Sequence, residues 1–466
     1  MKIYKLILCI FVVIFAQSIA FSKNYAILVS AGFVDGININ DDNGEAGLWY
    51  DLVLAYEYLI GNAGYSQENV LVFYGDGTEW NDTHISGDRY NLPTTHPRWL
   101  NTKGKYMVNY SLDVNEFANA ISDLSSKLTS KDNILVWWVH GHGVCNILNA
   151  NDDSYDAEVS APSPLDGWHF LEGCTSYLIY RNIYTVFNNF NSNNSNSTYC
   201  SRIKYLWATC RSGQLIKGSK TLLNGGNSNN DPYTFLITGC DFDELVNFQS
   251  INPYVTPDNK QEQYHNSFSY AVYCTLLGKN PWGGTIINYD QNSSSPSFSS
   301  FRDQNNDGVI SMRELYEALK RNGEPCLKGI SWVPPLSYDD SIRNWQSHQP
   351  PYSTPNPQDF RATPLLGDPC ASDPSNYYQY LNSFYIDEVL KLQGHTLNMQ
   401  AGETVRNYRV DQVIAGGAGG TPLIIPGGTS GSNINFVVDT RVHLQAGFHA
   451  ESGCKFHAFI GEITCQ

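Results

Sequence analysis

Basic residues are scarce in this chain, and their scarcity limits the kinds of macromolecule that it is expected to bind. The 466 residues contain 29 Lys and Arg against 45 Asp and Glu, which leaves a net charge of −16. Nucleic acid and anionic membrane surfaces would repel such a protein, so we expect neither as a partner. A simpler interpretation of the same charge is solubility.

Long apolar runs are also missing, apart from one at the start of the chain. Lys2 and Lys5 precede a short apolar stretch at residues 6–15, and Ser18-Ile19-Ala20 offers small residues for cleavage. This arrangement predicts an export signal at residues 1–20. The stretch is too short for a membrane-spanning helix, and we expect no transmembrane segment elsewhere. The protein is therefore expected to be secreted, extracellular or held at a cell surface.

Cysteines are present, but no pair has the Cys-x-x-Cys spacing of a zinc ribbon. Ten of the eleven cysteines follow the predicted signal. In an oxidising compartment some of them are expected to pair. Cys454 and Cys465 are candidates for a local bridge, although sequence alone does not define the pairing.

Buried strands alternate with helices through the first part of the chain. Short apolar runs rich in β-branched and aromatic residues predict strands, and a 3.6-residue periodicity predicts helices. This alternation indicates an α/β fold with a mostly parallel sheet. The strands are expected at 23–30, 69–74, 134–139, 203–209 and 233–239, and the helices at 48–60, 113–128 and 266–277.

Two of these strands end in residues that carry chemistry. His140-Gly141-His142-Gly143 closes one apolar run, and Cys210 directly follows a later one. If the two strands are parallel neighbours, an imidazole and a thiol meet at the same edge of the sheet. Such a pair suits nucleophilic catalysis by a thiolate, with the imidazole as base and later as acid. A lone cysteine after a strand is, however, often a small buried hydrophobic residue.

These two motifs resemble those of the caspase-like cysteine peptidases, the group that includes legumains and gingipains. Gly141-His142-Gly143 is similar to the family's strand-His-Gly motif, and residues 208–213 (Ala-Thr-Cys-Arg-Ser-Gly) are similar to the legumain nucleophile motif. The resemblance covers roughly residues 23–325. It implies a caspase-like three-layer α/β/α sandwich, with His142 as base and Cys210 as nucleophile. Gly143 and Cys210 would supply oxyanion-hole amides, and His140 is the competitor for the role of base.

The chain departs from legumains where those enzymes bind asparagine. Leu48-Trp49 falls near their Arg-His pair, and Ala208 stands in place of a Glu. The gap between His142 and Cys210 is also longer than is usual in these families. Asp241, Asp243 and Glu244 follow the next strand and would favour a basic side chain before the cleaved bond, or form a solvated loop.

A second motif predicts a calcium site at residues 303–314. This stretch satisfies the whole pattern of a twelve-residue calcium loop, with Gly308 at its sixth position. We expect a single structural Ca²⁺ here and no catalytic cofactor. The expected ligands are Asp303, Asn305, Asp307, Val309 through its carbonyl, Ser311 and Glu314.

The remainder of the chain divides into a linker and a tail. We place the peptidase domain at 21–330, a Pro- and Ser-rich linker at 331–389 and a small all-β domain at 390–466. The tail sequence from Val442 resembles tail modules of secreted Bacteroidetes proteins, which implies secretion or attachment to a cell surface. His443, His449 and His457 are either metal ligands or ordinary strand residues.

The sequence therefore predicts a secreted, legumain-like cysteine endopeptidase that acts on protein or peptide substrates. The alternative is a catalytically inactive, calcium-binding surface or adhesion protein built on a caspase-like scaffold.

Overall fold

The structure is a computed structural model that describes about two fifths of the chain. It describes residues 23–30, 45–74, 77, 107–111, 114–128, 132–141, 202–209, 234–238, 248–251, 263–279, 302–316, 318–319, 384–399, 403–417, 420–428 and 431–460. The predicted export signal and most of the predicted linker lie outside these ranges. In the described part of the chain, no helix is long and apolar enough to cross a membrane.

A five-stranded parallel sheet forms the centre of the first unit. Its strands lie in the order β2-β1-β3-β4-β5, and every neighbouring pair is parallel. The α/β class and the mostly parallel sheet predicted from the sequence are confirmed. The strands are β1 (Asn24–Ser30), β2 (Val70–Tyr74), β3 (Asn133–Gly141), β4 (Arg202–Thr209) and β5 (Thr234–Thr238).

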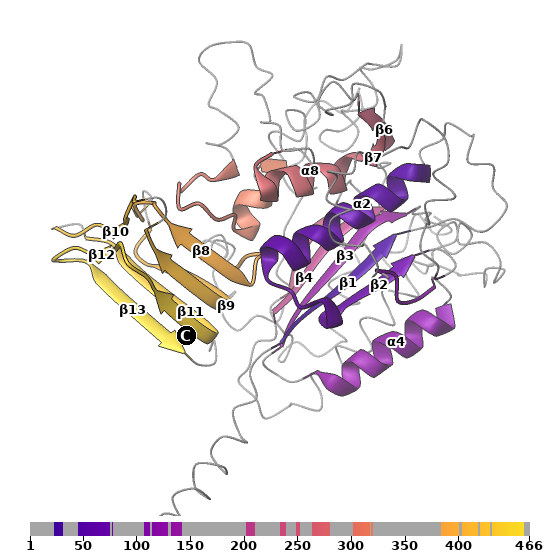
Figure 1. Ribbon diagram of the computed structural model, residues 1–466, viewed down its shortest axis with the longest axis horizontal. Helices are drawn as coiled ribbons and strands as arrows, with labels where there is room; N and C mark the ends of the chain where they lie inside the picture. Colours follow the sequence, from indigo (N-terminus) through magenta and orange to yellow (C-terminus); the bar gives the residue numbers. More distant parts are fainter. Residues whose placement is uncertain are drawn as a thin grey trace, which may run out of the picture.

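Helices cover both faces of this sheet (Figure 1). Helices α2 (Glu45–Tyr58) and α8 (Ser267–Leu277) share one core with alternate strand residues such as Leu28 and Trp137. Helix α4 (Val114–Lys127) packs on the opposite face, where Phe117 contacts Phe73 with ring centroids 4.6 Å apart. The strands are buried on both faces because their sequences are continuously apolar rather than alternating.

Two short elements connect α2 to β2. Helix α2 continues into a π-helical turn, η1 (Leu59–Ala63), and a 3₁₀ turn, η2 (Gln67–Asn69), precedes β2. The π turn ends at Gly64, whose φ of 86° lies in the left-handed region that glycine tolerates best. The sequence placed a helix over 48–60, so it located this element but not its π-helical end.

An antiparallel pair between β6 (Phe248–Ile251) and β7 (Gln263–Asn266) was not predicted. Strand β7 leads directly into α8 and packs near α2. Its polar sequence, Gln-Tyr-His-Asn, lacks the apolar alternation by which strands are recognised.

The second unit consists of parallel strands that wind into stacked turns of chain. Strands β8 (Val389–Gln393), β9 (Arg406–Gly416), β11 (Asn433–Leu444) and β13 (Lys455–Ile460) form one parallel sheet in that spatial order. A second, shorter parallel pair joins β10 (Leu423–Ile425) to β12 (Phe448–Ala450). Ile434, for example, pairs with Arg406 of the preceding turn and Phe456 of the following one.

The described part of this unit contains strands and turns, and its core lies between the two sheets. The sequence did not reveal that the pairing is parallel, because alternation of apolar and polar residues is the same in parallel and antiparallel strands.

Residues 384–388 join the two units (Figure 1). Phe384 and Ile386 are buried in the core of the first unit, whereas Tyr385 is buried in the core of the second. The backbone of Glu388 bonds to both units, donating to Ala63 and accepting from Gln412. The sequence assigned this segment to the linker, but its alternating apolar side chains are divided between two cores.

Candidate functional site

The strands that precede the predicted catalytic residues are neighbours in the sheet. Strand β3 ends at Gly141 and β4 ends at Thr209, and these two residues are partners in the parallel register. His142, Gly143 and Cys210 follow them in the sequence and lie outside the described residues, as do Asp241, Asp243 and Glu244. The backbone of the competing His140 belongs to β3, where it pairs with Ser30 across an irregularity in the register.

The ends of both strands are held by packing and by a hydrogen bond. The stacked rings of Trp138 in β3 and Trp207 in β4 have centroids 4.6 Å apart, and both side chains are fully buried. From the other face, Ser269 in α8 donates its hydroxyl to the carbonyl of Val139. These contacts fix the relative position of the two strand ends.

The beginnings of the same strands are held by one buried carboxylate. Glu388 accepts a hydrogen bond from Lys204 Nζ in β4 at 2.5 Å and another from Asn133 Nδ2 in β3 at 3.4 Å. The side chains of Lys204 and Glu388 are 2% and 0% exposed. A charged pair this deeply buried is stable only while both partners are present.

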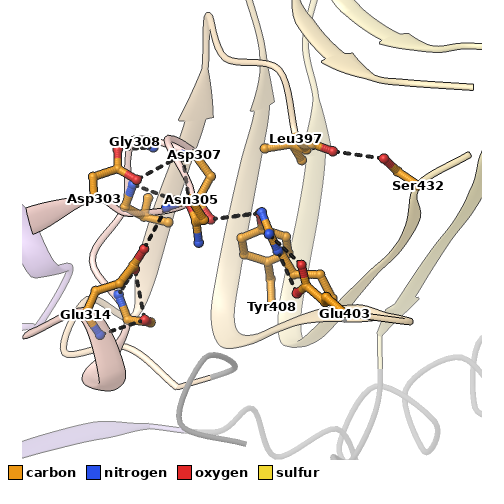
Figure 2. Close-up of polar contacts among 12 residues, drawn as sticks. Asp303, Asn305, Asp307, Gly308, Glu314, Leu397, Glu403, Tyr408 and Ser432 are labelled. Carbon is orange, nitrogen blue, oxygen red and sulfur yellow. Dashed lines mark hydrogen bonds and ion pairs between the residues drawn. The ribbon is translucent and has the colours of Figure 1, made fainter. Parts of the chain in front are cut away.

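The predicted calcium loop has the hydrogen bonding of a closed turn. Asp303 accepts from the N–H groups of Asp307 at 3.0 Å and Gly308 at 2.8 Å, and Asn305 accepts from Asp307 at 2.9 Å (Figure 2). Gly308 has a φ of 85°, as the tight turn at the sixth loop position requires. The polar side chains at the first, third and fifth positions therefore turn inward along the loop.

Glu314 closes the far end of the loop. Its carboxylate accepts from the N–H of Asn305 at 3.2 Å, and from the N–H and hydroxyl of Ser311 at 3.0 and 2.8 Å. Residues 312–316 are helical, which places Glu314 on the first turn of the predicted exiting helix. The carboxylate of Glu314, the last expected ligand, therefore points toward the first half of the loop.

Asp307 connects the loop to the second unit. Its Oδ1 accepts from the N–H of Val309 at 3.0 Å, and its Oδ2 accepts from the hydroxyl of Tyr408 in β9 at 2.9 Å (Figure 2). Arg406, also in β9, lies 4.0 Å from Oδ2 and is held by two hydrogen bonds to Glu403. The carboxylate of Asp307 is completely buried.

The crowding of these carboxylates raises their proton affinity. Burial raises the pKa of Asp307 well above its usual value, and the negative charges of Glu314 and Asp303 raise it further. Burial likewise raises the pKa of Glu314 to about 7. Buried carboxylates are stable when they are neutralised by a proton, a cationic side chain or a metal ion.

The structure brings all six predicted ligand positions into one hydrogen-bonded loop, in which five positions accompany Asp307. These are Asp303, Asn305, Val309, Ser311 and Glu314. Within the described ranges, no group of three His, Cys, Asp or Glu side chains has the arrangement of a metal site. A calcium loop also uses amide, hydroxyl and backbone carbonyl oxygens as ligands, and these do not belong to His, Cys, Asp or Glu side chains.

Sequence reasoning missed Tyr408 and Arg406, because they lie about a hundred residues after the loop. A tyrosine in an apolar strand carries no local signal that its hydroxyl reaches an aspartate in another unit. The contact of Tyr408 with Asp307 can be recognised only once β9 is placed beside the loop (Figure 2). Arg406 approaches Asp307 from the same strand.

The histidines of the tail are exposed and spread over different strands. His443 lies in β11, His449 in β12 and His457 in β13, where its ring stacks on Phe459. They form no metal-binding group among the residues that the structure describes. Cys454 is partly buried, and its candidate partner Cys465 lies outside the described ranges.

No model of a known protein family matches the chain, and a search of curated proteins finds no significant match.

Proposed function

We propose that this protein is an exported cysteine endopeptidase of the caspase-like type, with Cys210 as nucleophile and His142 as base. The proposal rests on one observation above the others, which is the pairing of Gly141 with Thr209. Because the chain continues from these two partners into His142 and Cys210, the two residues start from adjacent positions on one edge of a parallel sheet.

The strand order supports a ligand site at that edge. In an open parallel sheet with the order 2-1-3-4-5, ligands bind beyond the carboxyl ends of the strands, beside the point where the order reverses. That point lies between β1 and β3, and β3 is the strand that leads into His142. The helices on both faces also fit the caspase-like sandwich that the sequence motifs imply.

The proposed reaction is peptide hydrolysis in two steps. His142 takes the proton of the Cys210 thiol, and the sulfur attacks the carbonyl carbon of the scissile bond. His142 then gives this proton to the departing amine, and a thioester remains. Water, deprotonated by His142, cleaves the thioester to a carboxylic acid and restores the thiol. Amides of Gly143 and Cys210 stabilise the oxyanion in both steps.

A peptide-library cleavage assay tests this function. The Cys210→Ala and His142→Ala variants are expected to lose cleavage by about three orders of magnitude or more. Cys454→Ala, which removes a thiol in the second unit, is the matched control and should retain activity. Cys145, two residues after Gly143, is the weaker candidate for the nucleophile, and Cys145→Ala should retain activity. Wild-type activity in Cys210→Ala would refute the assignment of the nucleophile.

The same library defines the specificity. Enrichment of Lys or Arg before the cleaved bond would assign Asp241, Asp243 and Glu244 to the specificity pocket. Cleavage after Asn would contradict the expectation that this chain lacks the asparagine-binding pocket of legumains. A wild-type protein that cleaves nothing would favour the alternative of an inactive, calcium-binding surface or adhesion protein.

We further propose that the loop at 303–314 holds one structural Ca²⁺. The loop supplies carboxylate, amide, hydroxyl and carbonyl oxygens, the hard ligands that this ion prefers. Its buried carboxylates Asp307 and Glu314 are also short of neutralising charge. Calorimetric titration of chelator-treated protein with Ca²⁺ measures the site directly, with Mg²⁺ as the comparison ion.

A further inference from the structure

We infer that the loop at 303–314 is a clamp between the two units, so that ion binding and docking of the β8–β13 unit strengthen each other. This inference rests on the proposed calcium loop and adds a consequence to it. The contacts that carry it lie on both sides of the loop.

One side of the loop belongs to the core of the β8–β13 unit. The side chain of Val309 is buried in that core together with Tyr385 and Leu390. Gly308 lies so close to His395 that an added Cβ would be 2.4 Å from Nε2. The loop thus packs against the β8–β13 unit with its backbone as well as with a side chain.

The other side of the loop belongs to the first unit. Ile310, Met312 and Leu315 are buried in the core that contains α2 and α8, and Met312 donates its N–H to the carbonyl of Phe384. Because successive residues of one short segment enter two different cores, the units cannot separate without opening the loop.

The loop can reach Tyr408 and Arg406 in β9 because the neighbouring strand β8 is shorter than β9. The register pairs β8 with residues 412–416, so in the described chain the first half of β9, with Arg406 and Tyr408, has no neighbouring strand on that side. Tyr408 extends from the core of the β8–β13 unit, where its ring contacts Phe436, and its hydroxyl binds Asp307. Docking therefore removes Asp307 from water.

This geometry links the ion to docking thermodynamically. Docking the β8–β13 unit on an empty loop buries Asp307 beside two other carboxylates, with Arg406 at 4.0 Å as a nearby positive charge. A divalent cation in the loop neutralises these carboxylates and removes that cost. Since linkage is reciprocal, docking must raise ion affinity by the factor by which the ion favours docking.

Hydrogen–deuterium exchange of the full chain, with and without Ca²⁺, tests the clamp. Ca²⁺ is expected to slow exchange at least about 5-fold in residues 384–393 and 406–416 as well as in the loop. Helix α4 (114–127), on the far face of the first sheet, is the internal control and should change little. Slower exchange in the loop alone would overturn the clamp and leave the calcium site standing.

Two tyrosine variants complete the test by calorimetry. Tyr408→Phe removes the hydroxyl that binds Asp307, and it is expected to weaken Ca²⁺ binding at least about 5-fold. Tyr110→Phe removes a hydroxyl beside the edge strand β2, where the ring stacks on Phe73 outside the junction of the two units, so it should leave Ca²⁺ affinity unchanged.

Equal losses in both variants, or no loss in Tyr408→Phe, would overturn the clamp. No binding of Ca²⁺ to the wild-type chain would remove the calcium site and the clamp together. None of these readouts depends on peptidase activity, so they are independent of the assignment of Cys210.

Discussion

Replacing Glu388 with glutamine tests the buried ion pair that joins the two units. The substitution keeps the size of the side chain but removes the charge that faces Lys204 at 2.5 Å, in a position where both side chains are almost completely buried. Breaking a buried pair by removing one partner costs about 3–5 kcal/mol, because the remaining charge is left uncompensated. Asp387 also acts on Lys204 electrostatically, so we expect the lower end of that range.

The free energy of unfolding, measured by urea titration in a calcium-containing buffer, gives the magnitude. A second variant carries Lys204→Met in addition to Glu388→Gln. Because this double variant lacks both charges of the pair, it should recover about half of the loss or more. Arg441→Gln, at an exposed contact with Gln412, is the control and should cost no more than about 0.5 kcal/mol.

Two results would refute this reasoning. One is a loss below about 1 kcal/mol in Glu388→Gln, which is the value of an exposed pair rather than a buried one. The other is a double variant as unstable as the single variant, which would show that shape rather than charge determines the loss.

Three further predictions concern backbone geometry, pH and the ion. Gly64→Ala should lower the thermal midpoint of unfolding, because the φ of Gly64 is 86° and an added Cβ would lie 2.4 Å from the side chain of Val389 in β8. Gly61→Ala, whose added Cβ would have nothing within 4 Å, should leave the midpoint unchanged. Burial raises the pKa of Asp387 and of Asp411 to about 6. Protonation of both groups therefore stabilises the folded state at low pH, and this stabilisation is lost as the pH rises from about 4 through 6. Asp387→Asn should therefore flatten the pH dependence of the unfolding free energy over this window; an unchanged slope would contradict the assignment. Glu314→Gln should weaken Ca²⁺ binding at least about tenfold in calorimetry, and chelation should lower the thermal midpoint of wild type more than that of the variant.

The elements that could be predicted are those with a strong local signal. Residues 134–139 are continuously apolar and form part of β3, and the periodic run after Asp113 forms α4. The spacing of oxygen-bearing residues and Gly308 predicted a calcium loop at 303–314; the backbone turns there as that spacing requires, and the bound ion stays a prediction. In each case the relevant residues are neighbours in the sequence, so pattern and geometry coincide.

The elements that could not be predicted depend on contacts between distant residues. Lys204 interrupts the apolar run of β4, and nothing nearby indicates that Glu388, 184 residues later, neutralises it. The contact of Tyr408 with Asp307 spans 101 residues. The parallel winding of β8 to β13 is equally hidden, because each strand pairs with the next turn of chain rather than across a short hairpin.

The stacked turns of the second unit imply an order in which it comes apart. Among the described strands, the main contacts of each turn are with the turns beside it, so stability is close to a sum of contributions from neighbouring turns. The β8 end of the stack is anchored by residues 384–388 and the loop at 303–314, whereas β13 pairs on one side, with β11, in the described chain. Opening should therefore start at β13 and advance turn by turn toward β8. A pulling force applied at the β13 end would peel strands from the stack before it reached the junction with the first unit.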